Sequence, residues 1–296
     1  MRRENKEVGK YVSMEVGTEA NGEGLGKSGS SEITAHTDLL PPLKGLPATL
    51  YIRGQPPPAF SPLNRAANTT FDRPAKICIV GSRRHSDYGA RACRHIIAEL
   101  AMYDVWIISG LAFGIDSIAH DAALSACLPT AAVLGAGLDP EVLYPAAHRT
   151  LADGIVAAGG CIISQFEHNL RAAPWTFPVR NRTMAALADL VIIIEAEEKS
   201  GTLITARAAL EANIEVGVVP GSIFSPQSDG PLSLLNDGAH IIRGRDDIER
   251  ALGMHLRPRF GDRLTEMSKN VDGNSAAHSS PQKDIDTLFA KLVKSM

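Results

Sequence analysis

Several features that define common protein classes are scarce in this sequence. Its 296 residues include only four cysteines, Cys78, Cys93, Cys127 and Cys161, which lie in apolar segments without CxxC or metal-ligand spacing. We therefore expect buried free thiols and neither a disulfide framework nor a zinc site. No run approaches the roughly 18 apolar residues of a membrane span, and the charged first residues lack the apolar core of a secretory signal. We expect a cytoplasmic protein without a membrane partner.

Positive charge is scarce as well. The formal net charge is −3, and residues 76–250 carry 14 Lys and Arg against 20 Asp and Glu, a balance of −6. This composition excludes a general basic shell. A nucleic acid or another polyanion would therefore have to bind at a local cluster of arginines.

Composition divides the chain into three parts. Residues 1–45 are rich in Gly, Ser and Glu, which predicts a disordered tail; the segment GEGLGKS at 22–28 lacks the first glycine of a phosphate-binding loop. Residues 46–252 form the predicted domain, which begins with a proline-rich lead-in. Its one strand-like piece is at 49–53, and the prolines argue against a central strand. Residues 253–296 read as a polar linker and a short amphipathic helix.

Six short apolar runs lie between these ends, each followed by a Gly- or Ser-containing loop and a helical stretch. They are residues 76–81, 105–110, 130–135, 161–165, 190–196 and 215–221. Continuous apolarity predicts strands that are buried on both faces. We therefore predict an α/β fold, an extended Rossmann-like, doubly wound, largely parallel sheet with helices on both faces.

Small and charged residues follow these runs, where ligands bind in such sheets. They are Gly81, Ser82, Arg83 and Arg84 after the first run, Gly110 and Gly114 after the second, and Ser200, Gly201 and Thr202 after the fifth. Such a rim lets a phosphate approach the backbone. The G-x-G-x-x-G pattern is missing after the first run, so we expect no nicotinamide or flavin cofactor.

Two of these loops allow more than one interpretation. Asp116 and His120 are four residues apart and suit acid–base chemistry, but a helix cap at Asp116 and a packed His120 are favoured. Ser200 is either a plain helix N-cap or a cap that also binds phosphate.

The segment 177–190 places Arg180, Asn181 and Arg182 directly before an apolar segment. Arginines at such a position bind an anion together with free helical N–H groups, or they are solvated surface charge.

Motifs in one order from Gly81 to Gly221 resemble those of the DprA/Smf (DNA-processing protein A) family. They are GSR, SGLAFGID, AVLGAGLD…YP, FPVRNR, EA…KSGTLITA and VPG, and the resemblance extends from about residue 46 to about residue 252. It implies a non-enzymatic, homodimeric protein that binds single-stranded DNA and loads a RecA-type recombinase in natural transformation.

The resemblance also implies a DNA site on this rim. Its FPVRNR motif adds Phe177, Arg180, Asn181 and Arg182 to the rim residues named above. The arginines would gather around phosphates while Phe177 offers a face to a base. Arg182 has an alternative role, tying its helix to a neighbouring carboxylate.

This chain departs from the family where basic residues are common. Those places hold Phe113, Ala146, Pro174 and Val179, so we expect weaker binding with a flatter salt dependence. Trp175 would offset part of this by stacking, or it is a buried anchor.

Two other functions remain open. The first is an enzyme similar to nucleoside-monophosphate phosphoribohydrolases, whose PGGxGTxxE motif corresponds to KSGTLITARAALE; here the double glycine is missing and Glu211 comes several residues late. The second is a nucleotide sensor. For the dimer, we predict a contact around Leu232 to Leu235.

Overall fold

The computed structural model describes residues 33–36, 39–40, 45–58, 70–71 and 73–259. The segment 22–28 and the predicted C-terminal helix lie outside these residues. None of the helices in the described part is long and apolar enough to cross a membrane.

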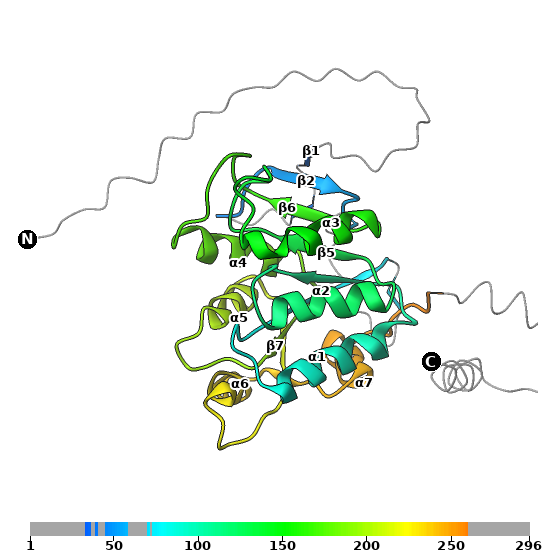
Figure 1. Ribbon diagram of the computed structural model, residues 1–296. Coiled ribbons are helices and arrows are strands. Elements are labelled where there is room, and N and C mark those ends of the chain that lie inside the picture. Colours follow the sequence, from blue (N-terminus) through cyan, green and yellow to red (C-terminus); the bar gives the residue numbers. More distant parts are fainter. Residues whose placement is uncertain (1–32, 37–38, 41–44, 59–69, 72, 260–296) are drawn as a thin grey trace, which may run out of the picture.

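The centre of the fold is one nine-stranded sheet (Figure 1). Its strands are β1 (Ile33–His36), β2 (Leu50–Gly54), β3 (Ala75–Gly81), β4 (Val105–Ser109), β5 (Thr130–Val133), β6 (Cys161–Ser164), β7 (Leu190–Ile194), β8 (Glu215–Val218) and β9 (His240–Ile241). They lie in the order β1-β2-β6-β5-β4-β3-β7-β8-β9. The pairs β1–β2 and β2–β6 are antiparallel, and the other pairs are parallel.

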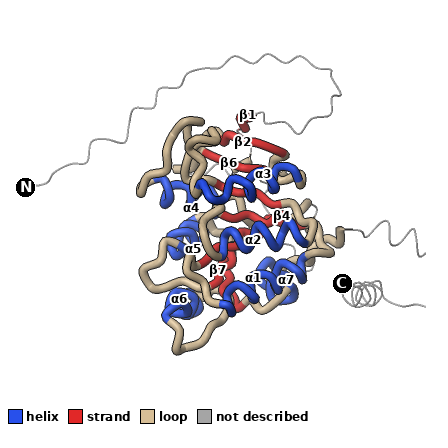
Figure 2. The backbone as a smooth tube through the Cα atoms, viewed as in Figure 1, coloured by secondary structure: helices blue, strands red, loops and turns tan. Residues whose placement is uncertain are grey.

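Helices cover both faces of this sheet (Figure 2). They are α1 (Asp87–Leu100), α2 (Ile115–Ser125), α3 (Arg149–Ala157), α4 (Thr176–Ala186), α5 (Thr202–Glu211), α6 (Asp229–Asn236) and α7 (Arg245–Leu252). The core cluster that holds Ile77 and Ile79 of β3 includes residues of α1, α2 and α7. Cys78 and Val80 belong to the opposite cluster with α4, α5 and α6, as the two-residue period of a strand requires. The predicted fold class and all six predicted strands are confirmed.

The chain order of the strands creates a switch point. From β3 the chain adds β4, β5 and β6 on one side, and then returns through α4 to place β7 on the other side of β3. The loops that follow β3 and β7 therefore leave the sheet in opposite directions. The crevice between them is the usual ligand site of an open α/β sheet.

Both predicted domain edges need correction. The lead-in strand β2 is not peripheral, because it pairs with β1 and β6 and buries Leu50 and Ile52. Within the tail predicted to be disordered, residues 33–36 form β1, which is paired along its length with β2. Beyond 252, Met254 and Leu256 pack into the core, so residues 253–259 belong to the domain.

The burial of individual residues bears on two further predictions. Cys127 is exposed, whereas the other three cysteines are buried as predicted. Leu234 of α6 is buried in the core of a single chain, and Leu235 packs against that core. Leu232 and Leu235 are only partly buried, so the dimer contact predicted around Leu232 to Leu235 stays a prediction.

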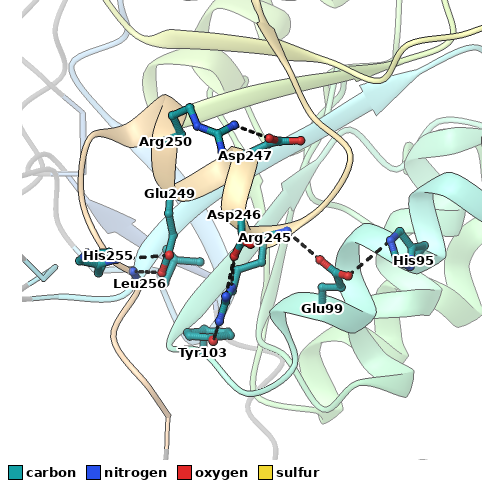
Figure 3. A network of polar contacts seen from close by, with 10 residues as sticks. All are labelled: His95, Glu99, Tyr103, Arg245, Asp246, Asp247, Glu249, Arg250, His255 and Leu256. Atoms are coloured by element: carbon teal, nitrogen blue, oxygen red, sulfur yellow. Dashed lines mark hydrogen bonds and ion pairs between the residues drawn. The ribbon is translucent and has the colours of Figure 1, made fainter. Parts of the chain in front are cut away.

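Polar contacts attach α7 to the rest of the domain (Figure 3). The Arg245 N–H donates to Glu99 Oε2 of α1 at 2.7 Å, and the Arg245 guanidinium also bonds the Tyr103 hydroxyl. Asp247 of α7 accepts hydrogen bonds from Arg250 in the same helix and from Arg243, which precedes it. These bonds hold α7 against α1 beside the apolar contacts of Ile248 and Leu252.

Candidate functional site

A pocket of about 510 Å³ lies at the switch point between β3 and β7. The residues that line it are Val80, Gly81, Ser82, Arg83, Arg84, Ala112, Asp116, Pro174, Phe177, Pro178, Arg180, Asn181, Met184, Glu197, Lys199, Ser200, Gly201, Thr202, Ile204 and Thr205. Ten of the thirteen predicted site residues are among them. Cationic side chains outnumber carboxylates in this set, so the pocket favours an anion.

The loop after β3 forms one wall of the pocket. A Cβ at Gly81 would lie 1.9 Å from the Ile194 carbonyl oxygen, so only glycine lets β3 end this close to β7. The Ser82 Oγ accepts the Arg84 N–H at 3.1 Å, which curls the loop toward the pocket. At its far end, the backbone N–H and hydroxyl of Ser86 both donate to the Glu195 carboxylate.

Arg83 is the exposed cation at the mouth. Its guanidinium carbon lies 5.5 Å from the centroid of the Phe177 ring, a cation–π arrangement. It makes no hydrogen bond or ion pair with any residue in the described ranges, so its N–H groups are available to a ligand. Arg84 is also exposed but lies 3.5 Å from Glu197.

Arg180 differs from Arg83 because its guanidinium is buried beneath the pocket, with the residue only 4% exposed. One nitrogen, Nη1, donates to the carbonyl oxygens of Gly110 and Val133, each at 2.6 Å, and Nε donates to Asn181 Oδ1 at 2.9 Å. Most of its donors are thus engaged within the protein. Arg180 contributes a positive field under the pocket rather than a free hydrogen-bonding fork.

Asp116 is the buried counter-charge of Arg180. Its Oδ2 accepts the Ala112 N–H at 3.4 Å, and burial raises the pKa of its carboxyl group while Arg180 opposes that shift. The prediction that Asp116 caps α2 is wrong by position, because the N-cap is Gly114.

His120 is a packing residue, as favoured from the sequence. Burial lowers the pKa of its imidazole to about 3, and its Nδ1 lies 2.8 Å from Thr130 Oγ1. Because the Thr130 hydroxyl donates to the Ile107 carbonyl, Nδ1–H of His120 is the donor in this contact. A neutral, buried imidazole so held has no acid–base role in the pocket.

The start of α5 forms the opposite wall. Its N-cap is Gly201 rather than the predicted Ser200, although Ser200 Oγ accepts the Thr202 N–H at 3.2 Å. The Thr202 hydroxyl donates to the Gly81 carbonyl at 3.1 Å, and Asn181 Nδ2 donates to the Gly201 carbonyl at 3.2 Å. These bonds hold the loops after β3 and β7 together at the crevice.

Three predicted residues do not line the pocket. Arg182 is exposed on α4 and forms an ion pair with Glu211 at 3.3 Å, the alternative role that its sequence context allowed. Gly110 lies under the pocket, where a Cβ would come within 2.3 Å of Arg180 Nη1. Gly114 lies behind the loop after β3, where the next N–H, that of Ile115, donates to the Ser82 carbonyl.

Lys199 is the main site residue missing from the predicted set. It is exposed, lines the pocket, and makes no hydrogen bond or ion pair within the described part of the chain. Its place in the loop between β7 and α5 was the available signal. Of the neutral departures, Pro174 lines the pocket, while Phe113 and Val179 are 48% and 37% exposed. Trp175 is 54% exposed rather than a buried anchor.

The described residues can be compared with what a metal site or the enzyme alternative would need. Among them, no group of three or more His, Cys, Asp or Glu side chains is placed to hold a metal ion. Glu211, the carboxylate that the enzyme alternative would need, does not line the pocket and pairs with Arg182 on the surface.

Comparisons with known proteins agree with this geometry. The family model described as DNA recombination-mediator protein A matches residues 37–253. Protein Smf of Escherichia coli (strain K12) is 40% identical over 185 residues, which cover 62% of this chain and 49% of that protein. DNA processing protein DprA of Bacillus subtilis (strain 168) is 38% identical over 180 residues, covering 61% and 60%. The chain thus spans about half to three fifths of the length of these curated relatives.

Two solved structures are similar throughout the domain. DNA processing protein A (DprA) from Streptococcus pneumoniae superposes with a TM-score of 0.58 at 33% identity, covering 69% of this chain and 66% of that one. DNA processing protein A from Helicobacter pylori, described for its unique single-stranded DNA binding mode, gives a TM-score of 0.59 at 26% identity, covering 81% and 98%.

Proposed function

The chain belongs to the DNA recombination-mediator protein A family, and from this premise we propose that it binds single-stranded DNA without sequence preference in the pocket between β3 and β7. The observation that carries the proposal is the arrangement at the mouth. There Arg83 offers an exposed, unpaired guanidinium next to the Phe177 ring, above the buried charge of Arg180.

Each part of the pocket suits a feature that all single strands share. Arg83 and Lys199 would contact phosphates, and the glycine-containing loops let the backbone approach closely. Phe177 presents an aromatic surface, and every base has a π face. Contacts of these kinds follow the strand and ignore its sequence.

The test is fluorescence anisotropy with a labelled oligo-dT across a series of salt concentrations. With two cations facing phosphates, the slope of log K against log salt is expected to be about −1.4, since each contact to a single strand contributes about −0.7. Arg83→Ala should weaken binding and flatten that slope by about 0.7. Arg182→Ala removes the same charge outside the pocket and is the matched control, for which we expect an unchanged slope.

Two results would contradict the proposal. One is an Arg83→Ala variant that binds DNA as the parent does. The other is a parent that fails to bind at low salt while a nucleoside monophosphate binds, which would favour the nucleotide-binding alternatives. Unlabelled duplex of the same length, added as a competitor, separates single-strand preference from general affinity for DNA.

We further propose that the bound strand is handed to a RecA-type recombinase by a homodimer of this protein, as in natural transformation. The measurement is recombinase ATPase activity on single strands coated with single-strand-binding protein, with and without this protein; equal rates would contradict the proposal. Light scattering of a Phe224→Asp variant tests the dimer, because Phe224 and Ile223 are 91% and 74% exposed in the loop that precedes α6.

A further inference from the structure

A second and much smaller depression, of about 10 Å³, adjoins the pocket on its β5 side. Its lining is Arg83, Gly110, Ala112, Phe113, Gly135, Tyr144, Pro145, Phe177 and Arg180. Four of these residues, Arg83, Ala112, Phe177 and Arg180, also line the pocket. The Arg83 and Phe177 side chains, which stack on each other, therefore lie between the pocket and the depression. A bound strand that leaves the pocket along the rim would reach the depression next.

The depression is distinguished by two aromatic rings that are half exposed. Phe113 is 48% exposed and Tyr144 is 45% exposed, although large apolar side chains are normally buried. The Phe113 ring contacts the His148 ring edge to face, with centroids 4.8 Å apart. The Tyr144 ring tilts against Phe177 at 5.8 Å. Both rings are thus held from one side and open on the other.

The loop that carries Phe113 is held in place by a hydrogen bond to its backbone. Leu111 adopts a left-handed φ of 56°, and its carbonyl accepts a hydrogen bond from His148 Nδ1 at 2.8 Å. The His148 ring therefore supports both the loop and the Phe113 ring. A ring fixed before a ligand arrives loses little conformational freedom on binding, so its contact area contributes more to affinity.

From these observations we propose that the exposed faces of Phe113 and Tyr144, beside this depression, form a base-stacking subsite for the bases that adjoin the pocket-bound nucleotides. This inference rests on the proposed function, because Arg83 must hold the same strand. It also answers the shortage of charge: the domain between residues 76 and 250 has a balance of −6, and stacking on neutral rings adds affinity that salt does not screen.

Two kinds of substitution separate the contribution of base stacking from that of apolar contact. Phe113→Leu and Tyr144→Leu keep apolar bulk but remove the π face, and each should weaken oligo-dT binding about fivefold or more with the salt slope unchanged. Phe113→Tyr and Tyr144→Phe keep the ring and should bind within about twofold of the parent. Both positions are exposed, and circular dichroism with thermal melting checks the fold of each variant.

A second readout does not depend on any variant. An oligonucleotide of the same length with abasic sites throughout should bind the parent more weakly than oligo-dT does, and it should bind both leucine variants as it binds the parent. Leucine variants that match the parent on oligo-dT would overturn the subsite while leaving the Arg83 pocket intact. A parent that binds neither ligand would instead overturn the proposed function itself.

Discussion

Replacing Arg180 by alanine should lower the free energy of unfolding and not only weaken DNA binding. The guanidinium is buried, and it supplies the donors for the carbonyl oxygens of Gly110 and Val133. It is also the charge that most strongly opposes the rise in the pKa of the buried Asp116 carboxyl. Its loss therefore leaves two unsatisfied acceptors and one uncompensated charge inside the domain.

The magnitude follows from these losses. An unsatisfied buried acceptor costs about 1–3 kcal/mol, and breaking a buried charge pair costs about 3–5 kcal/mol. The two costs overlap, so we expect Arg180→Ala to lower the free energy of unfolding by about 3–5 kcal/mol. This is a large share of the about 5–15 kcal/mol that holds a typical domain together.

The deficit should depend on pH through Asp116. Burial already raises the pKa of this carboxyl above its ordinary 3.8, and removing Arg180 raises it further. A pKa that is raised in the folded state contributes stability that is present at low pH and lost as the pH rises through it. The deficit of Arg180→Ala should therefore shrink as the pH falls toward the ordinary 3.8, and Asp116→Asn should restore part of the loss at higher pH.

Urea unfolding followed by the fluorescence of the buried Trp106 measures these differences by linear extrapolation. Arg182→Ala is the control, since its ion pair with Glu211 is exposed and is worth about 1 kcal/mol or less. The reasoning would be refuted by an Arg180→Ala variant whose unfolding free energy lies within about 1 kcal/mol of the parent at pH 8.

Three further predictions follow from other parts of the domain. In the native protein only Cys127, among the cysteines, should react with a thiol reagent, because burial raises the pKa of the other three thiols; reaction of more than one thiol before unfolding would contradict this. Asp247→Asn should cost about 1 kcal/mol of stability near neutral pH, since its hydrogen bond with the exposed Arg243 lowers the pKa of the Asp247 carboxyl. That contribution is lost as the pH falls below the ordinary 3.8, so urea midpoints of variant and parent should converge in acid. Glu195→Ala should release Ser86, at the end of the loop after β3, and so weaken DNA binding with no change in salt slope. An unchanged affinity would argue against a role for the Ser86–Glu195 hydrogen bonds in shaping the pocket.

The central strands were predictable because each is a continuous apolar run followed by a loop. β1 and β9 were not, since four and two residues carry little local signal and their pairing depends on distant segments. The same reason applies to β2. The nearby prolines argue against a strand inside the sheet, but pairing with the distant β6 and with β1 places β2 there.

The site shows the same division. The glycines, Arg83 and the loop after β7 follow from residue type and from their position at strand ends. Arg180 and Arg182 look alike in the sequence, because α4 has no apolar stripe to reveal which side faces inward; its buried side includes Thr176, Arg180 and Asn181. Only the packed domain separates them, burying Arg180 under β4 and β5 and leaving Arg182 beside Glu211.

Strand identity, fold class and the family motifs are thus local properties, written in runs of neighbouring residues. Which arginine is free to meet a ligand, and which aromatic rings stay exposed beside it, is decided where the ends of β3, β4, β5 and β7 converge. Burial and hydrogen-bond satisfaction there depend on residues far apart in the chain, such as Gly110 and Arg180, 70 positions apart, and Gly81 and Thr202, 121 positions apart. No single segment of the chain contains both partners of such a contact.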